Sequence, residues 1–300
     1  MIADFDHPSL VARDAAQIKR LAQAIGEVGF LTLSNTPLDA ARMGRVFDVY
    51  TRFFRLPEAH KQTVDMARTG ANRGWGASQS EQVDPQANPD YKQVFDCGFE
   101  LPQGHALADL SVYAPNQWPP EPPDFRETVQ DYYRDALGVA MDVLRAIAAA
   151  LGERPDHFDQ AFDHPMALLR GNYYPTRPEW AGAQDFGIAA HTDYGCLTLL
   201  AMDGRPGLEV KRPDGSWQPV TVPPGQFVIN FGEMLEMWTA GRARATEHRV
   251  IGSEHERISI PMFFNPNYKT NVAPKGAAPV LAGDHLSRRF NETYVHLQTG

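Results

Sequence analysis

Residues 189–200 read AAHTDYGCLTLL and place His191 and Asp193 two positions apart, at the start of an apolar segment. Side chains two apart in an extended chain point to the same side, so this pair can bind one metal ion. A third ligand is available in the segment ATEHRV, as His248. Two histidines and one carboxylate on neighbouring strands form the facial arrangement that holds Fe(II) and leaves coordination positions open. Taken alone, the spacing also fits a chance His-x-Asp pair and an ordinary half-buried histidine.

A second group of polar residues follows in the segment RISI, where Arg257 and Ser259 share one face of an expected strand. An arginine that points into a barrel core is costly unless it is paired with an anion. This segment has no acidic residue at a matching position, so a ligand carboxylate could be the anion, bound by the guanidinium and the serine hydroxyl. Alternatively, Arg257 pairs with a protein carboxylate at the barrel rim or faces solvent.

The elements that must position these residues fall into two parts. Apolar residues at helical spacing predict helices over 18–28, 43–54 and 125–151, with the β-prone segment GFLTLSN between the first two. From residue 167 onward, short β-like runs alternate with turn dipeptides, which indicates an antiparallel sandwich or barrel. Residues 68–124 are rich in Gly, Pro, Asn and Asp and predict loops, which either cover a site or serve as a flexible connector.

Composition limits the partners. The chain has 300 residues, 43% of them hydrophobic, and a formal net charge of −9 without a basic stripe, which argues against nucleic-acid binding and favours small molecules. No apolar stretch is long enough to span a bilayer, and the N-terminus lacks a secretory signal pattern, so we expect no membrane association and a cytoplasmic location. The two cysteines, Cys97 and Cys196, are expected to be reduced and buried.

Six segments in this order resemble the Fe(II) and 2-oxoglutarate-dependent dioxygenases, specifically the isopenicillin N synthase-like family. The segments are GFLTLSN, FFRLPEAHK, NYYP at 172–175, HTDYGCLTLL at 191–200, VINFGEMLEMWTAGRARATEHRV at 228–250 and RISIPMFFNP at 257–266.

The resemblance implies a fold of the α+β class that is mainly β: a double-stranded β-helix (jelly roll, cupin-like) core with an N-terminal helical buttress. It divides the chain into an N-terminal helical and loop region, residues 1–110, and a region of the long helix plus the jelly-roll catalytic domain, residues 111–300. This agrees with the helices-first, strands-second order predicted above.

The resemblance also assigns residues. The implied Fe(II) ligands, which are also the catalytic residues, are His191, Asp193 and His248. The implied anchors for the distal carboxylate of 2-oxoglutarate are Arg257 and Ser259, and Asn172 and Tyr174 of NYYP match further positions that contact this cosubstrate. The implied reaction is oxidation of an unactivated C–H bond of a small molecule by O2, most simply hydroxylation, with release of succinate and CO2.

The substrate side is less defined. Counting in steps of two along 257–263 puts Phe263 on the inward face, as a substrate contact or a core residue. Arg73 and Trp75 lie in a Gly-rich segment that could reach over the site or be a surface loop; if Arg73 faces the pocket, a carboxylate-bearing substrate is favoured. Histidines outside the metal site, His285 among them, are expected at the surface or at helix caps.

Two other functions fit these residues. One is an Fe(II) oxidase of the isopenicillin N synthase or aminocyclopropane carboxylate oxidase type, which does not use 2-oxoglutarate. The other is a non-catalytic jelly-roll module that binds a carboxylate. Open coordination positions favour an enzyme, because structural metal sites are normally closed by a fourth protein ligand.

Overall fold

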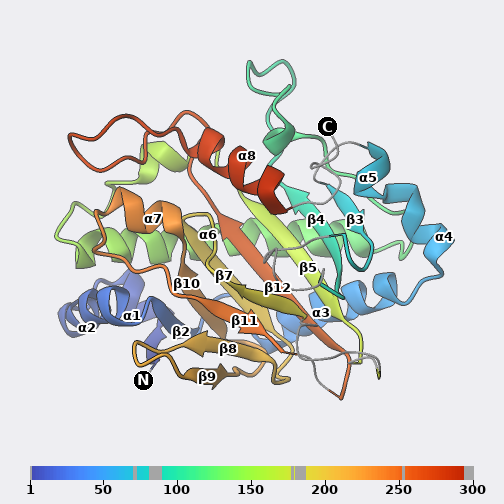
Figure 1. The fold of residues 1–300 in the computed structure, drawn as a ribbon, viewed down its shortest axis with the longest axis horizontal. Coiled ribbons are helices and arrows are strands. Elements are labelled where there is room, and N and C mark those ends of the chain that lie inside the picture. Colours follow the sequence, from blue (N-terminus) through green and yellow to red (C-terminus); the bar gives the residue numbers. More distant parts are fainter. Residues whose placement is uncertain are drawn as a thin grey trace.

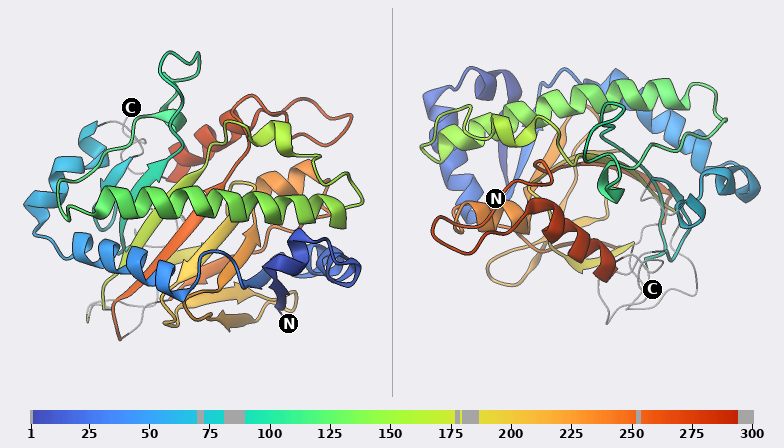
Figure 2. Two further views of the ribbon diagram at one scale, coloured as in Figure 1. Left: turned by 180° about the vertical axis from the view of Figure 1, so that it is seen from behind. Right: turned by 90° about the horizontal axis from the view of Figure 1, so that it is seen from above.

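The computed structural model describes residues 2–69, 73–80, 90–176, 179, 187–251 and 254–293. Its core is two β-sheets, one of eight strands and one of four, that face each other with helices on the outer face of the larger sheet (Figures 1 and 2). This is the expected jelly roll with a helical buttress.

The larger sheet has the order β1-β2-β10-β7-β12-β5-β4-β3. Its strands are β1 (Ala3–Asp6), β2 (Phe30–Ser34), β3 (Gly74–Gly76), β4 (Gln93–Gly98), β5 (Leu168–Tyr174), β7 (Leu197–Met202), β10 (Phe227–Phe231) and β12 (Arg257–Phe264). The smaller sheet has the order β6-β11-β8-β9. Its strands are β6 (Ile188–His191), β8 (Leu208–Lys211), β9 (Trp217–Val220) and β11 (His248–Val250).

The helices of the buttress form where apolar residues recur every three or four positions. The α-helices are α1 (His7–Val11), α2 (Ala15–Glu27), α3 (Ala40–Phe54), α4 (Glu58–Lys61), α5 (Met66–Thr69), α6 (Phe125–Ala150), α7 (Glu233–Trp238) and α8 (Ala282–Thr293). Short 3-10 turns are η1 (Gln62–Val64), η2 (Ser111–Tyr113) and η3 (Asp159–Phe162). Aspartates cap three of these helices: Asp6 accepts a hydrogen bond from one backbone N–H group of α1, Asp14 from two of α2, and Asp39 from one of α3.

The long helix α6 crosses the outer face of the larger sheet (Figure 2, left). Its buried residues, such as Val129, Val143 and Ile147, recur at helical spacing and join the main core with residues of β7, β10 and β12. A cluster of aromatic rings in edge-to-face contact, including Tyr50, Phe95 and Phe125, connects α3 and α6 to this sheet. The helices thus hold one wall of the barrel rigid.

Part of the loop prediction for 68–124 is wrong, because β3 and β4 lie within this segment and extend the larger sheet past β5. β4 contains Asp96, a residue rare in strand interiors, and its charge is matched by Arg170 directly opposite on β5. β1, α1 and α8 were also not predicted. Strands from both sides of residue 110 share one sheet, and the division of the chain there stays a prediction.

Both cysteines are free and buried, as expected. No helix within the described ranges is long and apolar enough to cross a membrane.

Candidate active site

The smaller sheet brings the three expected metal ligands together. His191 ends β6 and His248 begins β11, and the two residues are direct partners in this antiparallel pair. Asp193 follows β6 by two positions, and its Oδ1 lies 3.8 Å from Nε2 of each histidine. The candidate ligand atoms all lie within 4.8 Å of one another, and among the described residues this is the one such cluster of histidine, cysteine and carboxylate side chains. The expected triad therefore exists as a geometric unit.

Backbone carbonyls fix the tautomer of both imidazoles. Nδ1 of His191 lies 2.8 Å from the carbonyl oxygen of Ala189, and Nδ1 of His248 lies 3.1 Å from that of Thr246. A carbonyl oxygen only accepts hydrogen bonds, so each Nδ1 carries the proton and donates it. Each Nε2 then presents a lone pair toward Asp193. This arrangement, in which the second ring nitrogen is held by a hydrogen bond, is typical of histidine metal ligands.

The carboxylate of Asp193 is oriented by two neighbours. Its Oδ2 accepts hydrogen bonds from the Thr198 hydroxyl and from Nδ2 of Asn230, the latter at 2.6 Å. Thr198 lies on β7 and Asn230 on β10, which are paired strands of the larger sheet. Because both donors bind Oδ2, Oδ1 remains directed toward the histidines.

The loop that carries Asp193 packs against the start of α7. The Glu233 amide donates to the Asp193 carbonyl at 2.8 Å, and the Met234 amide donates to the Gly195 carbonyl at 3.0 Å. A Cβ at Gly232 would lie 2.3 Å from the Gly195 carbonyl oxygen and 2.6 Å from that of Asp193. This approach needs glycine at position 232, which explains the glycine in the segment VINFGE.

The surroundings set the ionisation of the triad for metal binding. Burial lowers the pKa of His191 to about 4, with help from His248 and against the opposing effect of Asp193. For Asp193, burial would raise the pKa, but the two histidines and the hydrogen bonds from Thr198 and Asn230 lower it overall. At neutral pH the site therefore offers a neutral His191 imidazole and a carboxylate, the states that bind a divalent metal. The donor set fits Fe(II).

The four expected cosubstrate residues lie together on β5 and β12. In this antiparallel pair, Arg257 is the direct partner of Tyr174, and Ser259 is the direct partner of Asn172. The Arg257 guanidinium lies 4.9 Å from the centre of the Tyr174 ring, and Asn172 Nδ2 lies 3.5 Å from the Ser259 hydroxyl.

Among the described residues, no carboxylate pairs with Arg257. Arg257 is 2% exposed, and its Nε and Nη1, together with Oδ1 of Asn172, lack hydrogen-bond partners within the described part of the chain. Buried polar atoms without partners are rare in proteins and indicate a ligand. A carboxylate fits here, because the guanidinium can donate two parallel hydrogen bonds to it. Of the two alternatives considered for Arg257, neither rim pairing nor exposure to solvent agrees with this geometry.

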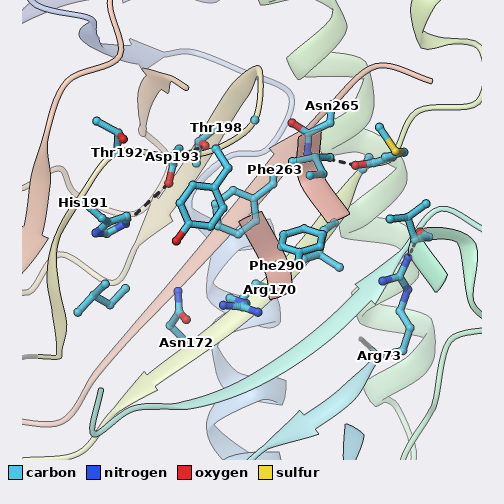
Figure 3. A pocket seen from close by; sticks show the side chains of 18 of the residues that line it. Arg73, Arg170, Asn172, His191, Thr192, Asp193, Thr198, Phe263, Asn265 and Phe290 are labelled. Carbon is cyan, nitrogen blue, oxygen red and sulfur yellow. Dashed lines mark hydrogen bonds and ion pairs between the residues drawn. The ribbon is translucent and has the colours of Figure 1, made fainter. Parts of the chain in front are cut away.

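A pocket opens beside the triad, and Figure 3 shows its lining. Phe263 of β12 lies on the inward face and lines this pocket, as the alternation of the strand predicts. Arg73 also lines it, at the end remote from His191 (Figure 3), where its Nη2 donates to the Val112 carbonyl at 2.6 Å.

Trp75 lies elsewhere. It is 3% exposed, it is not among the described residues that line the pocket, and its indole N–H donates to Gln93 at 3.0 Å. The ammonium of Lys61 lies 5.2 Å from the centre of its ring. These contacts are those of a core residue.

Several pocket residues were not found from the sequence. Leu286 and Phe290 of α8 line the pocket, and so do Lys92 and Arg170. His285 of α8, expected at the surface, is 7% exposed, and its Nε2 lies 3.0 Å from the Tyr194 carbonyl oxygen. The alternation on β5 could have found Arg170, which is two positions from Asn172, whereas Lys92 lies in a stretch without a periodic pattern.

Comparisons with known proteins agree with this site. Residues 165–266 match the 2OG-Fe(II) oxygenase superfamily, and residues 2–121 match the N-terminal region of a non-haem dioxygenase in morphine synthesis. The chain is 33% identical to a 2-oxoglutarate-Fe(II) type oxidoreductase, hxnY, of Emericella nidulans over 96% of this chain and 89% of that protein. It is 31% identical to a homoarginine-6-hydroxylase of Glycine max over 93% and 90% of the two chains.

Two solved structures with bound 2-oxoglutarate (alpha-KG), one of them also with Fe, have the same fold as this chain. Full-length Neurospora crassa T7H in complex with alpha-KG superposes with a TM-score of 0.85 at 28% identity, covering 96% of this chain and 95% of that one. JOX2 in complex with 2OG, Fe and JA superposes with a TM-score of 0.81 at 26% identity, covering 99% and 88%.

The chain belongs to the 2OG-Fe(II) oxygenase superfamily. It is a 2-oxoglutarate-dependent dioxygenase, an oxidoreductase that uses Fe(II), 2-oxoglutarate and O2 and acts on a small molecule. Of the three functions that the sequence left open, the first is therefore confirmed.

Proposed function

We propose that His191, Asp193 and His248 hold the catalytic Fe(II), that Arg257 and Ser259 bind the distal carboxylate of 2-oxoglutarate, and that the enzyme hydroxylates a carboxylate-bearing small molecule in the adjacent pocket. Asn172 and Tyr174 complete the cosubstrate site. The observation that carries the proposal is the buried Arg257 guanidinium, whose Nε and Nη1 lack a hydrogen-bond partner among the described residues, on the strand that also supplies Phe263 to the pocket.

Charge balance supports this arrangement. The metal, the Asp193 carboxylate, the dicarboxylate cosubstrate and the Arg257 guanidinium have charges that sum to zero. A buried site tolerates such charges when they cancel and each one is directly bound. When bound, the iron would let O2 act as the oxidant, so that one oxygen atom oxidises 2-oxoglutarate to succinate and CO2 and the other oxidises an unactivated C–H bond of the substrate.

The chain's own residues orient the metal-binding atoms and exclude water from the cosubstrate site. The carbonyls of Ala189 and Thr246 hold both histidine Nε2 atoms toward one point, and Asn230 and Thr198 hold Asp193 Oδ1 there. The Tyr174 ring covers one side of Arg257 and keeps the carboxylate site dry, which strengthens the ion pair that forms there.

The metal assignment is tested with metal-free protein under anaerobic conditions. Fe(II) is added and 2-oxoglutarate is titrated while the weak visible charge-transfer band of the iron-bound keto acid is recorded. We expect a saturable band in the wild type and none in Asp193→Ala, because that variant no longer retains iron. Asp214→Ala, which removes an exposed turn carboxylate, is the matched control and should behave as the wild type.

Normal iron content together with normal succinate release in Asp193→Ala contradicts the assignment of the ligands. A wild type that binds iron but shows no band contradicts the assignment of the cosubstrate site.

A further inference from the structure

The charged residues that line the pocket are almost all of one sign. Among the described lining residues, the cations are Arg73, Lys92 and Arg170, and the one acid is Asp193, which belongs to the triad. The three cations are 3%, 3% and 8% exposed. Burying a cation costs free energy unless the cation is paired with an anion, so the presence of three buried cations around one pocket needs an explanation.

Two of these cations belong to ion pairs that point their positive ends at the pocket. Arg170 donates two hydrogen bonds to Asp96, at 2.8 and 2.6 Å, and the Lys92 ammonium lies 2.7 Å from Asp90. Arg170 and Lys92 line the pocket, whereas Asp96 and Asp90 do not and are 0% and 1% exposed. Each pair is neutral as a whole, but its positive end is nearer to the pocket, so the field inside the pocket favours an anion.

Both cations are fixed within reach of the triad. Asp90 also accepts a hydrogen bond from the Ala189 amide at 3.4 Å, which ties Lys92 to the strand that ends in His191. Arg170 shares the inward face of β5 with Asn172, and Figure 3 shows it between the triad and Arg73. Arg73 is held at the remote end, so Lys92 and Arg170 are better placed to receive a substrate group.

The rest of the lining is apolar and aromatic. Phe263 of β12 lies on one side, and Leu286 and Phe290 reach in from α8, which lies over the same end of the barrel (Figure 1). The Tyr194 ring lines the pocket too, with the Arg289 guanidinium 4.2 Å from its centre. Flat rings pack favourably against aromatic side chains of this kind.

We infer that the substrate is a small organic acid with an aromatic or alicyclic body, whose carboxylate is received by Lys92 and Arg170 while the ring packs between Phe263 and α8. This inference rests on the proposed function and deepens it, because it assigns the residues that select the substrate. A neutral ring compound would leave the positive field unmatched, and an amine would be repelled by it.

The test uses the holoenzyme with Fe(II) and 2-oxoglutarate under anaerobic conditions. The probes are 3-phenylpropanoate, 3-phenylpropanamide, 3-phenylpropylamine, cyclohexylacetate, its amide, and octanoate, and binding is measured as the perturbation of the charge-transfer band. We expect the ring carboxylates to bind at least tenfold more tightly than their amides, and the amine to bind most weakly. A tenfold difference corresponds to about 1.4 kcal/mol.

The variants remove each cation together with its own carboxylate, because a lone buried charge would threaten folding. They are Arg170→Gln/Asp96→Asn and Lys92→Met/Asp90→Asn, and the control is the exposed pair Arg145→Gln/Asp159→Asn. We expect the preference for carboxylate over amide to fall below threefold in at least one of the first two and to persist in the control. Phe290→Ala should weaken the binding of ring carboxylates at least fivefold.

The outcomes separate this inference from the proposed function. Loss of the band in the wild type speaks against the iron and cosubstrate sites themselves. If the wild-type band is normal, any one of three results overturns the substrate inference. These are that amides or the amine bind as tightly as the carboxylates, that no carboxylate perturbs the band, or that both double variants keep the full preference for carboxylate over amide. Octanoate that binds as tightly as 3-phenylpropanoate overturns the assignment of a ring-shaped body.

Discussion

Replacing Arg257 with leucine should weaken cosubstrate binding and at the same time stabilise the metal-free protein. The Arg257 guanidinium is 2% exposed, and its Nε and Nη1 have no partner among the described residues. In the ligand-free state it is therefore a buried charge that contacts the Tyr174 ring but is not compensated by a carboxylate of the described residues. The shorter, apolar leucine side chain removes that cost and can pack against the Tyr174 ring.

The two effects have opposite signs and can be given magnitudes. Removing one partner of a buried ion pair costs about 3–5 kcal/mol, so the Kd for 2-oxoglutarate should rise about 100-fold to several thousand-fold in Arg257→Leu. Removing an unpartnered buried charge should raise the free energy of unfolding of the metal-free protein by about 1–3 kcal/mol, which corresponds to a few degrees in Tm.

Two measurements check this prediction: anaerobic titration of the charge-transfer band for the Kd, and thermal unfolding without metal for the Tm. Arg52→Leu is the control, because Arg52 is largely exposed and already paired with Asp48 and Asp124. It should leave the Kd unchanged and lower the stability slightly, by less than about 1 kcal/mol. An unchanged Kd in Arg257→Leu refutes the role of the arginine, and a lower Tm refutes the description of its charge as uncompensated.

Three further predictions concern the triad. Asn230→Ala should lower Fe(II) affinity about 10- to 100-fold, measured by metal titration, because Asp193 loses a donor that orients it; an unchanged affinity would contradict this. Gly232→Ala should lower both the Tm and the Fe(II) affinity, because its Cβ would clash with the loop that carries Asp193. Gly44→Ala, whose Cβ would meet no atom within 4 Å, should change neither, and equal behaviour of the two variants argues against the clash. In the metal-free protein, the pKa of His191 is lowered to about 4 in the folded state, against 6.5 in the unfolded chain. Below pH 6.5 the unfolded chain therefore binds a proton that the folded protein does not, and the free energy of unfolding should fall by up to about 3 kcal/mol toward pH 4. Urea unfolding at several pH values should show this slope, and it should be flatter in His191→Gln.

The triad and the cosubstrate residues could be located from the sequence because strands impose a period of two. That period alone places Arg257 and Ser259 on one side of β12. The same count led from His191 to Asp193, although Asp193 lies in the loop after β6. The partners across the sheet, His248 opposite His191 and Asn172 opposite Ser259, follow once the strands pair in register. The resemblance supplied that pairing, which no local pattern contains.

Apart from Phe263 and Arg73, the pocket residues discussed above were not found in this way, because several of them come from segments with weak local signals. Lys92 precedes β4 within a Gly- and Pro-rich stretch, and its role depends on Asp90 and on the distant Ala189 amide. The partners of Arg170 likewise become visible only when β4 pairs with β5. In α8, Leu286 and Phe290 are at helical spacing, but one such pair of apolar residues is too short a pattern to indicate a helix by itself.

Strand β5 links the two halves of the site. Its inward face carries Tyr174 and Asn172, which pair with Arg257 and Ser259 of β12, and then Arg170 and Leu168 beside the pocket. A slip of the β5–β12 register by one residue would turn all four side chains to the outer face, so both functions depend on the same pairing. The triad instead lies on β6, β11 and the loop after β6, fixed by β7, β10 and α7. The residues that we propose to select the substrate, Arg170, Lys92 and those of α8, therefore lie outside the segments that carry the proposed iron ligands.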